Sequence, residues 1–207
     1  MLAIAGPNSP RLLGAVTDAD LSDDAFPPYR MRHTDIGHAP VFAQRLSFTG
    51  ETGWEIFVTP DFAEHVLEII LKAGQPLGLR LAGGEALNAL RIEKGFLHWG
   101  ADMAYTEAPY QLGLDFICKP GKTLPFIGLD ACLARKTDPK GPCLRSVRLA
   151  DPDAILHHNE PVLRDGQIIG FVTSGAFCAM QKAAVGLCLV SPPDRAGRFE
   201  AVDDGPC

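Results

Sequence analysis

The chain has 207 residues, of which 46% are hydrophobic and 21% are charged, and its formal net charge is −6. This is the composition of an ordinary globular protein with one large domain or two small ones. The acidic balance and the absence of a Lys/Arg cluster argue against a nucleic-acid partner, because binding phosphates requires a basic patch.

No apolar run approaches the roughly 20 residues that cross a bilayer. The N-terminus also lacks the basic region of a secretory signal. We therefore expect no membrane partner and a cytoplasmic location.

The chain begins with alternating strand and turn signals. Residues 2–4 predict a short strand, and the turn after it contains Ser9, which we expect to cap a helix. Residues 29–37 predict a strand plus a turn. Because the chain starts at once with a strand of the buried type, we expect upstream sequence to be missing.

Residues 41–58 give the clearest strand signal, a pair of strands joined by the loop 49–53. The two glycines in that loop would let its backbone approach a ligand. In the second strand, Glu55 is opposite in phase to Trp54 and Ile56. We therefore expect the Glu55 carboxylate on the other face of the sheet.

Two helices follow. Pro60 fits the first turn of a helix with a buried stripe, which Gly74 ends. A second helix spans roughly 84–94, and Gly95 is expected to end it in the left-handed conformation. In this helix we expect one buried side, formed by Leu87, Leu90 and Ile92. We expect the charged side chains to point elsewhere, namely Arg91, Glu93 and Lys94.

The second half predicts a short helix at 130–135 and then a small antiparallel β unit. Its expected strands are 144–149, 161–163, 168–173 and 183–190, with a hairpin turn at 164–167. The Pro- and Gly-containing stretch between helix and strands reads as a linker. The expected domains are therefore 1–135, a linker at 136–142, and 143–207.

Cysteine and histidine patterns predict no metal site. None of the six cysteines forms a C-x-x-C pair, and Cys178 and Cys188 lie in apolar stretches typical of buried free thiols. The pair His157-His158 is interpreted as a surface loop. For His98 and Asp102, four residues apart, two readings are open: a chemical role, or hydrogen bonds that fix the turn between them.

Four charged residues stand out as a group: Glu51, Glu55, Arg91 and Glu93. Two carboxylates on a hairpin and a nearby guanidinium suit a heterocycle with a donor edge and an anionic tail. The same pattern also suits an ion-paired surface or a structural Arg–Glu pair. From the residues alone, the structural alternative is favoured.

A resemblance to a known family favours the ligand-binding role of these charged residues over the structural one. Arg45–Ile56 resembles the R-x-S/T-Y/F-x-G-E-x-G-x-E strand pair of the folate-binding aminomethyltransferases, which include the glycine-cleavage T-protein and the C-terminal regions of dimethylglycine and sarcosine dehydrogenases. Ala86–Gly95 resembles the A-L-x-x-L-R-I/L-E-K-G helix of that family, and His98–Asp102 resembles its dehydrogenase branch. Phe126–Gly128 and Gly170–Gly175 resemble its F-I-G and G-x-V-T-S-G segments.

The resemblance implies an α+β, β-rich, cloverleaf-like folate-binding fold with a small C-terminal antiparallel β-barrel-like domain. It implies tetrahydrofolate as the cofactor. Glu55 would hold the pterin edge, Arg91 would help to position the folate, and Phe48 would pack on the ring, with Glu51 in the same group. Phe48 stands where many members have tyrosine, so one hydroxyl hydrogen bond is lost.

The implied activity is transfer of a one-carbon (methylene or aminomethyl) unit from a methylated amine donor to the folate. A flavin-dependent oxidoreductase domain or subunit is the implied partner, and FAD would belong to that partner. A demethylase acting on a sulfur or oxygen methyl donor is a further reading within the family.

Two departures from the family pattern bear on activity. The family's catalytic aspartate belongs to a strand that precedes residue 1, so we expect a truncated or shortened member and assign no catalytic residue. Gln111 stands where a glutamate is usual. The alternative hypothesis is therefore a non-catalytic folate-binding or assembly module.

Overall fold

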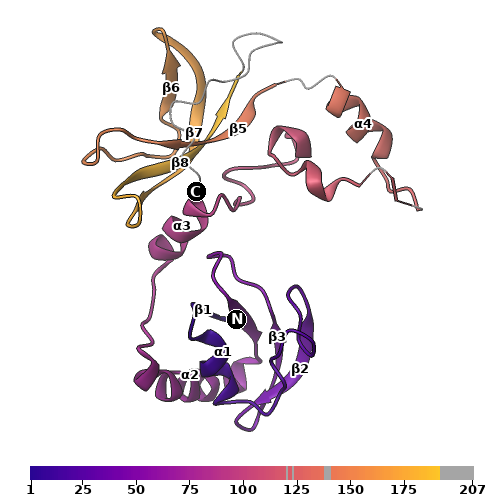
Figure 1. The fold of residues 1–207 in the computed structure, drawn as a ribbon, viewed down its shortest axis with the longest axis vertical. Coiled ribbons are helices and arrows are strands. Elements are labelled where there is room, and N and C mark those ends of the chain that lie inside the picture. The colour runs from indigo at the N-terminus through magenta and orange to yellow at the C-terminus, as the bar shows by residue number, and fades with distance from the viewer. Residues whose placement is uncertain (120, 123, 138–140, 192–207) are drawn as a thin grey trace. The chain divides into compact units, whose positions relative to one another are not determined.

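The computed structural model describes residues 1–119, 121–122, 124–137 and 141–191 (Figure 1). The chain divides into two compact units, Met1–Leu87 and the residues from Asn88 onward, which we describe separately as unit 1 and unit 2. Part of the expected linker, at 138–140, and the last residues including Cys207 lie outside the described residues. The division at 135 and 143 stays a prediction.

Unit 1 is a four-stranded antiparallel sheet in the order β1-β4-β3-β2. The strands are β1 (Leu2–Ala5), β2 (Met31–Ile36), β3 (Ala39–Gln44) and β4 (Gly53–Phe57). All four were expected from the sequence, and β3 and β4 are neighbours, as the predicted strand pair requires.

Helices cover one face of this sheet. They are α1 (Ser9–Gly14) and α2 (Pro60–Gly74), the latter followed by the short η1 (Gln75–Leu77). Their apolar side chains form one core with the inward residues of the strands, among them Trp54 and Ile56. The alternation of a strand therefore places one set of side chains in this core and the other on the opposite face.

The expected Ser9 cap is wrong. The N-cap residue of α1 is Asn8, and no side chain caps this helix. The Ser9 hydroxyl instead lies 2.7 Å from the Gly6 carbonyl and 2.8 Å from the Thr52 carbonyl. Pro10 follows directly and suits the first helical turn, so the helix begins one residue earlier than a Ser9 cap would allow.

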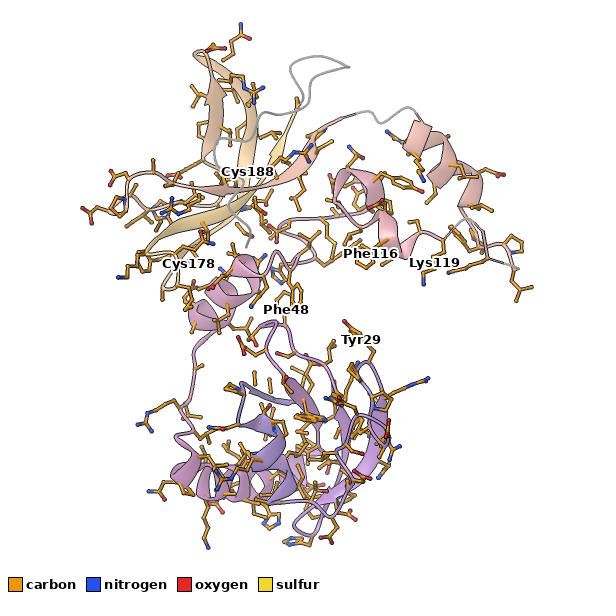
Figure 2. The ribbon with its side chains drawn as sticks, viewed as in Figure 1. Tyr29, Phe48, Phe116, Lys119, Cys178 and Cys188 are labelled. Carbon is orange, nitrogen blue, oxygen red and sulfur yellow. The ribbon has the colours of Figure 1, made fainter. Side chains whose placement is uncertain are left out.

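Unit 2 contains a second four-stranded antiparallel sheet in the order β5-β8-β7-β6. Its strands are β5 (Cys143–Arg148), β6 (Pro161–Arg164), β7 (Gln167–Cys178) and β8 (Ala183–Val190). Asp165 and Gly166 both have positive φ, which confirms the predicted hairpin turn. Cys178 and Cys188 are buried free thiols in this sheet, as expected (Figure 2).

Helices join and flank this sheet. The helix α3 (Gly84–Glu93) leads into unit 2, and η2 (Pro109–Gln111), η3 (Asp115–Ile117) and α4 (Leu129–Thr137) follow it. Gly95 has φ +70°, and the Gly95 and Phe96 N–H groups donate to the Ile92 and Arg91 carbonyls. This is the Schellman arrangement, and it confirms the predicted end of the helix.

The expected buried side of α3 is partly wrong. Leu90 is 39% exposed, whereas Arg91 is 2% exposed and lies beside the buried Ile92. Ile92 packs against Cys178, Val185 and Leu187 of the sheet. Arg91 tolerates the same environment because a buried carboxylate is present there, as described below.

Candidate functional site

Glu55 lies on the face of the unit 1 sheet that the helices do not cover. It sits in β4 between Ala3 of β1 and Gln44 of β3, its register partners. Trp54 and Ile56 on either side of it are 1% and 0% exposed and point into the core. The predicted phase of Glu55 is therefore confirmed.

Other outward side chains surround this carboxylate. They belong to four strands, and we call the set the open face: Ala3, Ala5, Met31, His33, Phe42, Gln44, Glu55 and Phe57. Phe42 and Phe57 are register partners, and the His33 ring meets Phe42 edge-on at a centroid distance of 4.4 Å. Phe42 is 48% exposed and Met31 is 52% exposed. The open face thus offers a half-buried carboxylate next to apolar and aromatic surface.

The loop between β3 and β4 carries the other two candidates from unit 1. Phe48 is half-buried at this loop (Figure 2), and Glu51 is exposed. The Ser47 and Thr49 hydroxyls are 2.8 Å apart, and Gly50 has φ +72°. Local hydrogen bonds and a left-handed glycine therefore fix the backbone on which Phe48 and Glu51 are mounted.

The core behind the open face holds the β3–β4 connection in place. Arg45 forms an ion pair with Asp23 at 2.7 Å, donates to the Phe26 carbonyl at 2.6 Å, and lies over the Trp54 ring. A Cβ at Gly53 would lie 2.4 Å from the Ile4 carbonyl oxygen. Only glycine allows β1 and β4 to approach this closely, so the glycine before Trp54 helps to set the sheet that presents Glu55.

Arg91 belongs to unit 2 and is engaged in a buried network. Its guanidinium forms an ion pair with Asp102 and donates to the Ser174 hydroxyl at 2.7 Å. It also donates to the Asn88 side chain at 2.9 Å and to the Phe96 carbonyl at 3.1 Å. Four of the five guanidinium N–H groups are thus accounted for by these contacts.

Asp102 is the centre of that network. It is 0% exposed and accepts hydrogen bonds from the His98 N–H at 2.9 Å and from the Thr173 hydroxyl at 2.6 Å. Burial raises the pKa of Asp102, but the Thr173, Ser174 and His98 hydrogen bonds and the Arg91 charge outweigh it. The pKa therefore lies below the ordinary 3.8.

These contacts decide between the two readings of His98 and Asp102. The Asp102 carboxylate accepts the His98 N–H, and the Asp102 N–H donates back to the His98 carbonyl at 2.9 Å. Hydrogen bonds that fix the turn are confirmed. Thr173 and Ser174, the partners from β7, were missed as functional candidates, although the G-x-V-T-S-G resemblance had marked their segment.

Gln111 has a structural task that a glutamate could not perform. It is buried, its amide oxygen accepts the Ala108 N–H at 2.8 Å, and its amide nitrogen donates to the Pro142 carbonyl at 2.9 Å. A carboxylate would offer no donor to that carbonyl. The residue therefore ties η2 to the start of β5.

Other places in the described residues suit a folate less well. A cavity of about 390 Å³ in unit 1 is lined by Asp18 and Asp35 and by no basic side chain, so it does not suit an anionic ligand.

Among the described residues, no group of three or more His, Cys, Asp or Glu could hold a metal ion. The ring of His158 contacts the Thr173 carbonyl at 2.7 Å. Within the described part of the chain, no helix is long and apolar enough to cross a membrane.

The architecture is that of a mixed helix-and-sheet protein with a C-terminal antiparallel β unit. Residues 1–122 match the GCVT N-terminal domain, and residues 143–203 match the glycine cleavage T-protein C-terminal barrel domain. The chain therefore belongs to the glycine cleavage T-protein family. The expected α+β fold with a C-terminal barrel-like domain is confirmed.

Its relatives are longer proteins. The chain is 39% identical over 96% of its length to the 4-methylaminobutanoate oxidase (formaldehyde-forming) of Paenarthrobacter nicotinovorans, and it spans 24% of that relative. It is 37% identical over 86% of its length to mitochondrial dimethylglycine dehydrogenase of Mus musculus, of which it spans 20%. With the aminomethyltransferase of Halothermothrix orenii the identity is 33% over 90% of the chain, and 51% of the relative is covered.

A solved structure has the same fold. The crystal structure of glycine cleavage system aminomethyltransferase T from Bartonella henselae matches 91% of this chain and 50% of its own, with a TM-score of 0.73 and 24% sequence identity. The chain thus spans about half of the aminomethyltransferases and about a fifth to a quarter of the oxidase and dehydrogenase relatives.

Proposed function

We propose that the chain binds tetrahydrofolate at the open face and serves one-carbon transfer. The observation that carries this proposal is the position of Glu55, a half-buried carboxylate flanked by Ala3 and Gln44 on the sheet face opposite to α1 and α2. A carboxylate can accept two N–H bonds from the aminopyrimidine edge of a pterin. Phe48 would pack on the ring, and Glu51 would contribute a second carboxylate at the loop.

Arg91 enters the proposal as a positioning residue. Its guanidinium is buried and occupied by Asp102, Ser174, Asn88 and a backbone carbonyl. A group with this many partners is poorly suited to bind the anionic tail of a folate directly. We propose that Arg91 instead fixes the end of α3 and the turn that follows.

Isothermal titration with 5-formyltetrahydrofolate, a stable reduced folate, tests the binding proposal. Loss of a charge-assisted hydrogen bond costs about 1.5–3 kcal/mol, so Glu55→Gln should weaken binding about 10- to 150-fold. Glu68→Gln is the matched control, because Glu68 is an exposed carboxylate on α2. Equal affinities for the two variants would contradict the role of Glu55.

Turnover is a separate proposal. We propose transfer of a methylene or aminomethyl unit from a methylated amine, in association with a flavin-dependent oxidoreductase domain or subunit that would hold FAD. Support comes from the relatives of the chain, which include a dimethylglycine dehydrogenase and an aminomethyltransferase. The cytoplasm is the proposed compartment.

One observation favours the alternative, a non-catalytic folate-binding module. Asp102 belongs to the His98–Asp102 segment that resembles the dehydrogenase branch of the family. Its carboxylate is fully buried and paired with Arg91, so it cannot act as a base on a substrate. Incubation of the chain with tetrahydrofolate, a methylated amine and a flavin-dependent oxidoreductase that oxidises the amine to its iminium separates the two hypotheses, with the same mixture without the chain as the control. Formation of methylene-tetrahydrofolate indicates an enzyme, and binding without product indicates a module.

A further inference from the structure

Two thiols meet in unit 2 on short helices that carry no candidate folate ligand. Cys118 directly follows η3, and its N–H donates to the Asp115 carbonyl at 3.0 Å. Cys132 lies on α4, and its N–H donates to the Gly128 carbonyl at 2.9 Å. The side chains of the two cysteines form a hydrogen bond with each other. Backbone hydrogen bonds therefore anchor both members of a thiol pair.

A contact between α4 and η2 brings a third element to this pair. Lys136 lies one turn after Cys132 on the same face of α4, and its Nζ is 6.0 Å from the centre of the Tyr110 ring of η2. Burial raises the pKa of Tyr110, and the neighbouring Cys118 and Cys132 thiols raise it further. The elements η2, η3 and α4 thus converge on the two sulfur atoms.

The pair suits a disulfide better than a metal ion. Zinc sites in proteins take at least three side-chain ligands. The described residues contain no group of three or more His, Cys, Asp or Glu that could supply them. Cys118 and Cys132 are both half-buried, whereas Cys178 and Cys188 are buried. A small oxidant in solution can therefore reach the pair.

We propose that Cys118 and Cys132 form a reversible disulfide, with a low-molecular-weight disulfide such as oxidised glutathione as the oxidant. The Cys132 sulfur attacks one glutathione sulfur, forms a mixed disulfide and releases the first glutathione thiol. The Cys118 sulfur then attacks the Cys132 sulfur and releases the second glutathione thiol. The two protons and two electrons of the cysteine thiols pass to glutathione, and the new bond ties η3 to α4.

The direction of the hydrogen bond assigns the order of attack. Burial raises the pKa of Cys118, and its hydrogen bond with the Cys132 thiol raises it further. A hydrogen bond that raises a pKa stabilises the protonated form, so Cys118 is the donor and Cys132 the acceptor. Because the thiolate is the attacking species, Cys132 attacks first and Cys118 resolves the mixed disulfide.

Incubation of the folded whole chain with oxidised glutathione, followed by iodoacetamide, trypsin and mass spectrometry, tests the proposal. Trypsin cleaves after Lys122, between the two cysteines. We expect a peptide pair joined through Cys118 and Cys132, which reduced glutathione separates again. Cys118→Ser removes the resolving thiol, so the mixed disulfide on Cys132 should accumulate. Cys143→Ser is the matched control, because Cys143 is also half-buried, and it should leave the cross-link unchanged.

Several results would overturn the proposal, and the first needs no variant. Both thiols of the folded chain could stay free, or a mixed disulfide on Cys132 could persist although Cys118 is present. A cross-link from Cys132 to a different cysteine also contradicts the pairing. So does a cross-link that forms equally well in the urea-unfolded chain, because the folded structure then does not direct it. None of these outcomes depends on folate binding.

Discussion

Replacing Asp102 by Asn removes the negative charge from the interior of unit 2 and leaves the Arg91 cation in place. The change is nearly isosteric, so any effect comes from charge and hydrogen bonding rather than from a cavity. Asp102 is 0% exposed and Arg91 is 2% exposed, so water does not compensate the loss. The His98 N–H and the Arg91 guanidinium would both face an amide that brings donors of its own.

The expected cost is large on the scale of protein stability. Breaking a buried ion pair by removing one partner typically costs about 3–5 kcal/mol. A domain as a whole is stable by only about 5–15 kcal/mol. We therefore expect Asp102→Asn to lower the free energy of unfolding of unit 2 by about 3–5 kcal/mol.

Urea unfolding, monitored through the hydrogen exchange of the β7 and β8 amides, measures this change in the free energy of unfolding of unit 2. Asp115→Asn is the control, because Asp115 is exposed on η3. Since the pKa of Asp102 is lowered, its contribution is present above the ordinary 3.8 and is lost as the pH falls through the folded-state pKa. The variant should lack this acid-dependent loss. Equal stabilities for the two variants would refute the assignment of the network.

Three further changes test other parts of the structure. Gln111→Glu places a carboxylate at a buried position, leaves the half-buried Pro142 carbonyl without its donor and should destabilise unit 2 by about 1–3 kcal/mol in urea unfolding. Gly53→Ala places a methyl group against the Ile4 carbonyl and should cost unit 1 about 1–3 kcal/mol, measured by Trp54 fluorescence. Cys188 is fully buried, and burial raises its pKa to about 11, so iodoacetamide should label it only on unfolding, as mass spectrometry would detect.

Each of these changes has a control in the chain. Gln167→Glu changes an exposed amide and should be neutral, and equal effects at Gln111 and Gln167 would contradict the tie to Pro142. A Cβ at Gly14 would have its nearest neighbour at 3.8 Å, so Gly14→Ala should be tolerated. If Gly14→Ala and Gly53→Ala lower the free energy of unfolding equally, the close approach of β1 and β4 at Gly53 does not explain the cost. Cys143 is half-buried and is the control for Cys188. If iodoacetamide labels both thiols at the same rate in the folded protein, Cys188 is not buried.

Local patterns in the sequence predicted most of the elements correctly. The phase of Glu55 against Trp54, the end of α3 at Gly95 and the hairpin at Asp165-Gly166 all depend on a few adjacent residues. Such features follow from strand alternation and from the conformations that glycine allows. The Ser9 cap failed because the helix begins one residue earlier, which the pattern alone does not resolve.

The burial of Arg91 could not be predicted from its helix. A charged residue in an amphipathic pattern is normally assigned to the surface. Its partners lie 11 positions away at Asp102 and 83 positions away at Ser174. Only tertiary packing brings these three residues together, so the resemblance marked each motif without revealing that the motifs meet.

Titration of the purified chain with 5-formyltetrahydrofolate, in parallel with Glu55→Gln and Glu68→Gln, tests the central claim most directly. We predict measurable binding that Glu55→Gln weakens about 10- to 150-fold and that Glu68→Gln leaves unchanged. Absence of binding by the folded chain, or equal affinities for both variants, would contradict the proposal that the open face with Glu55 is a folate site.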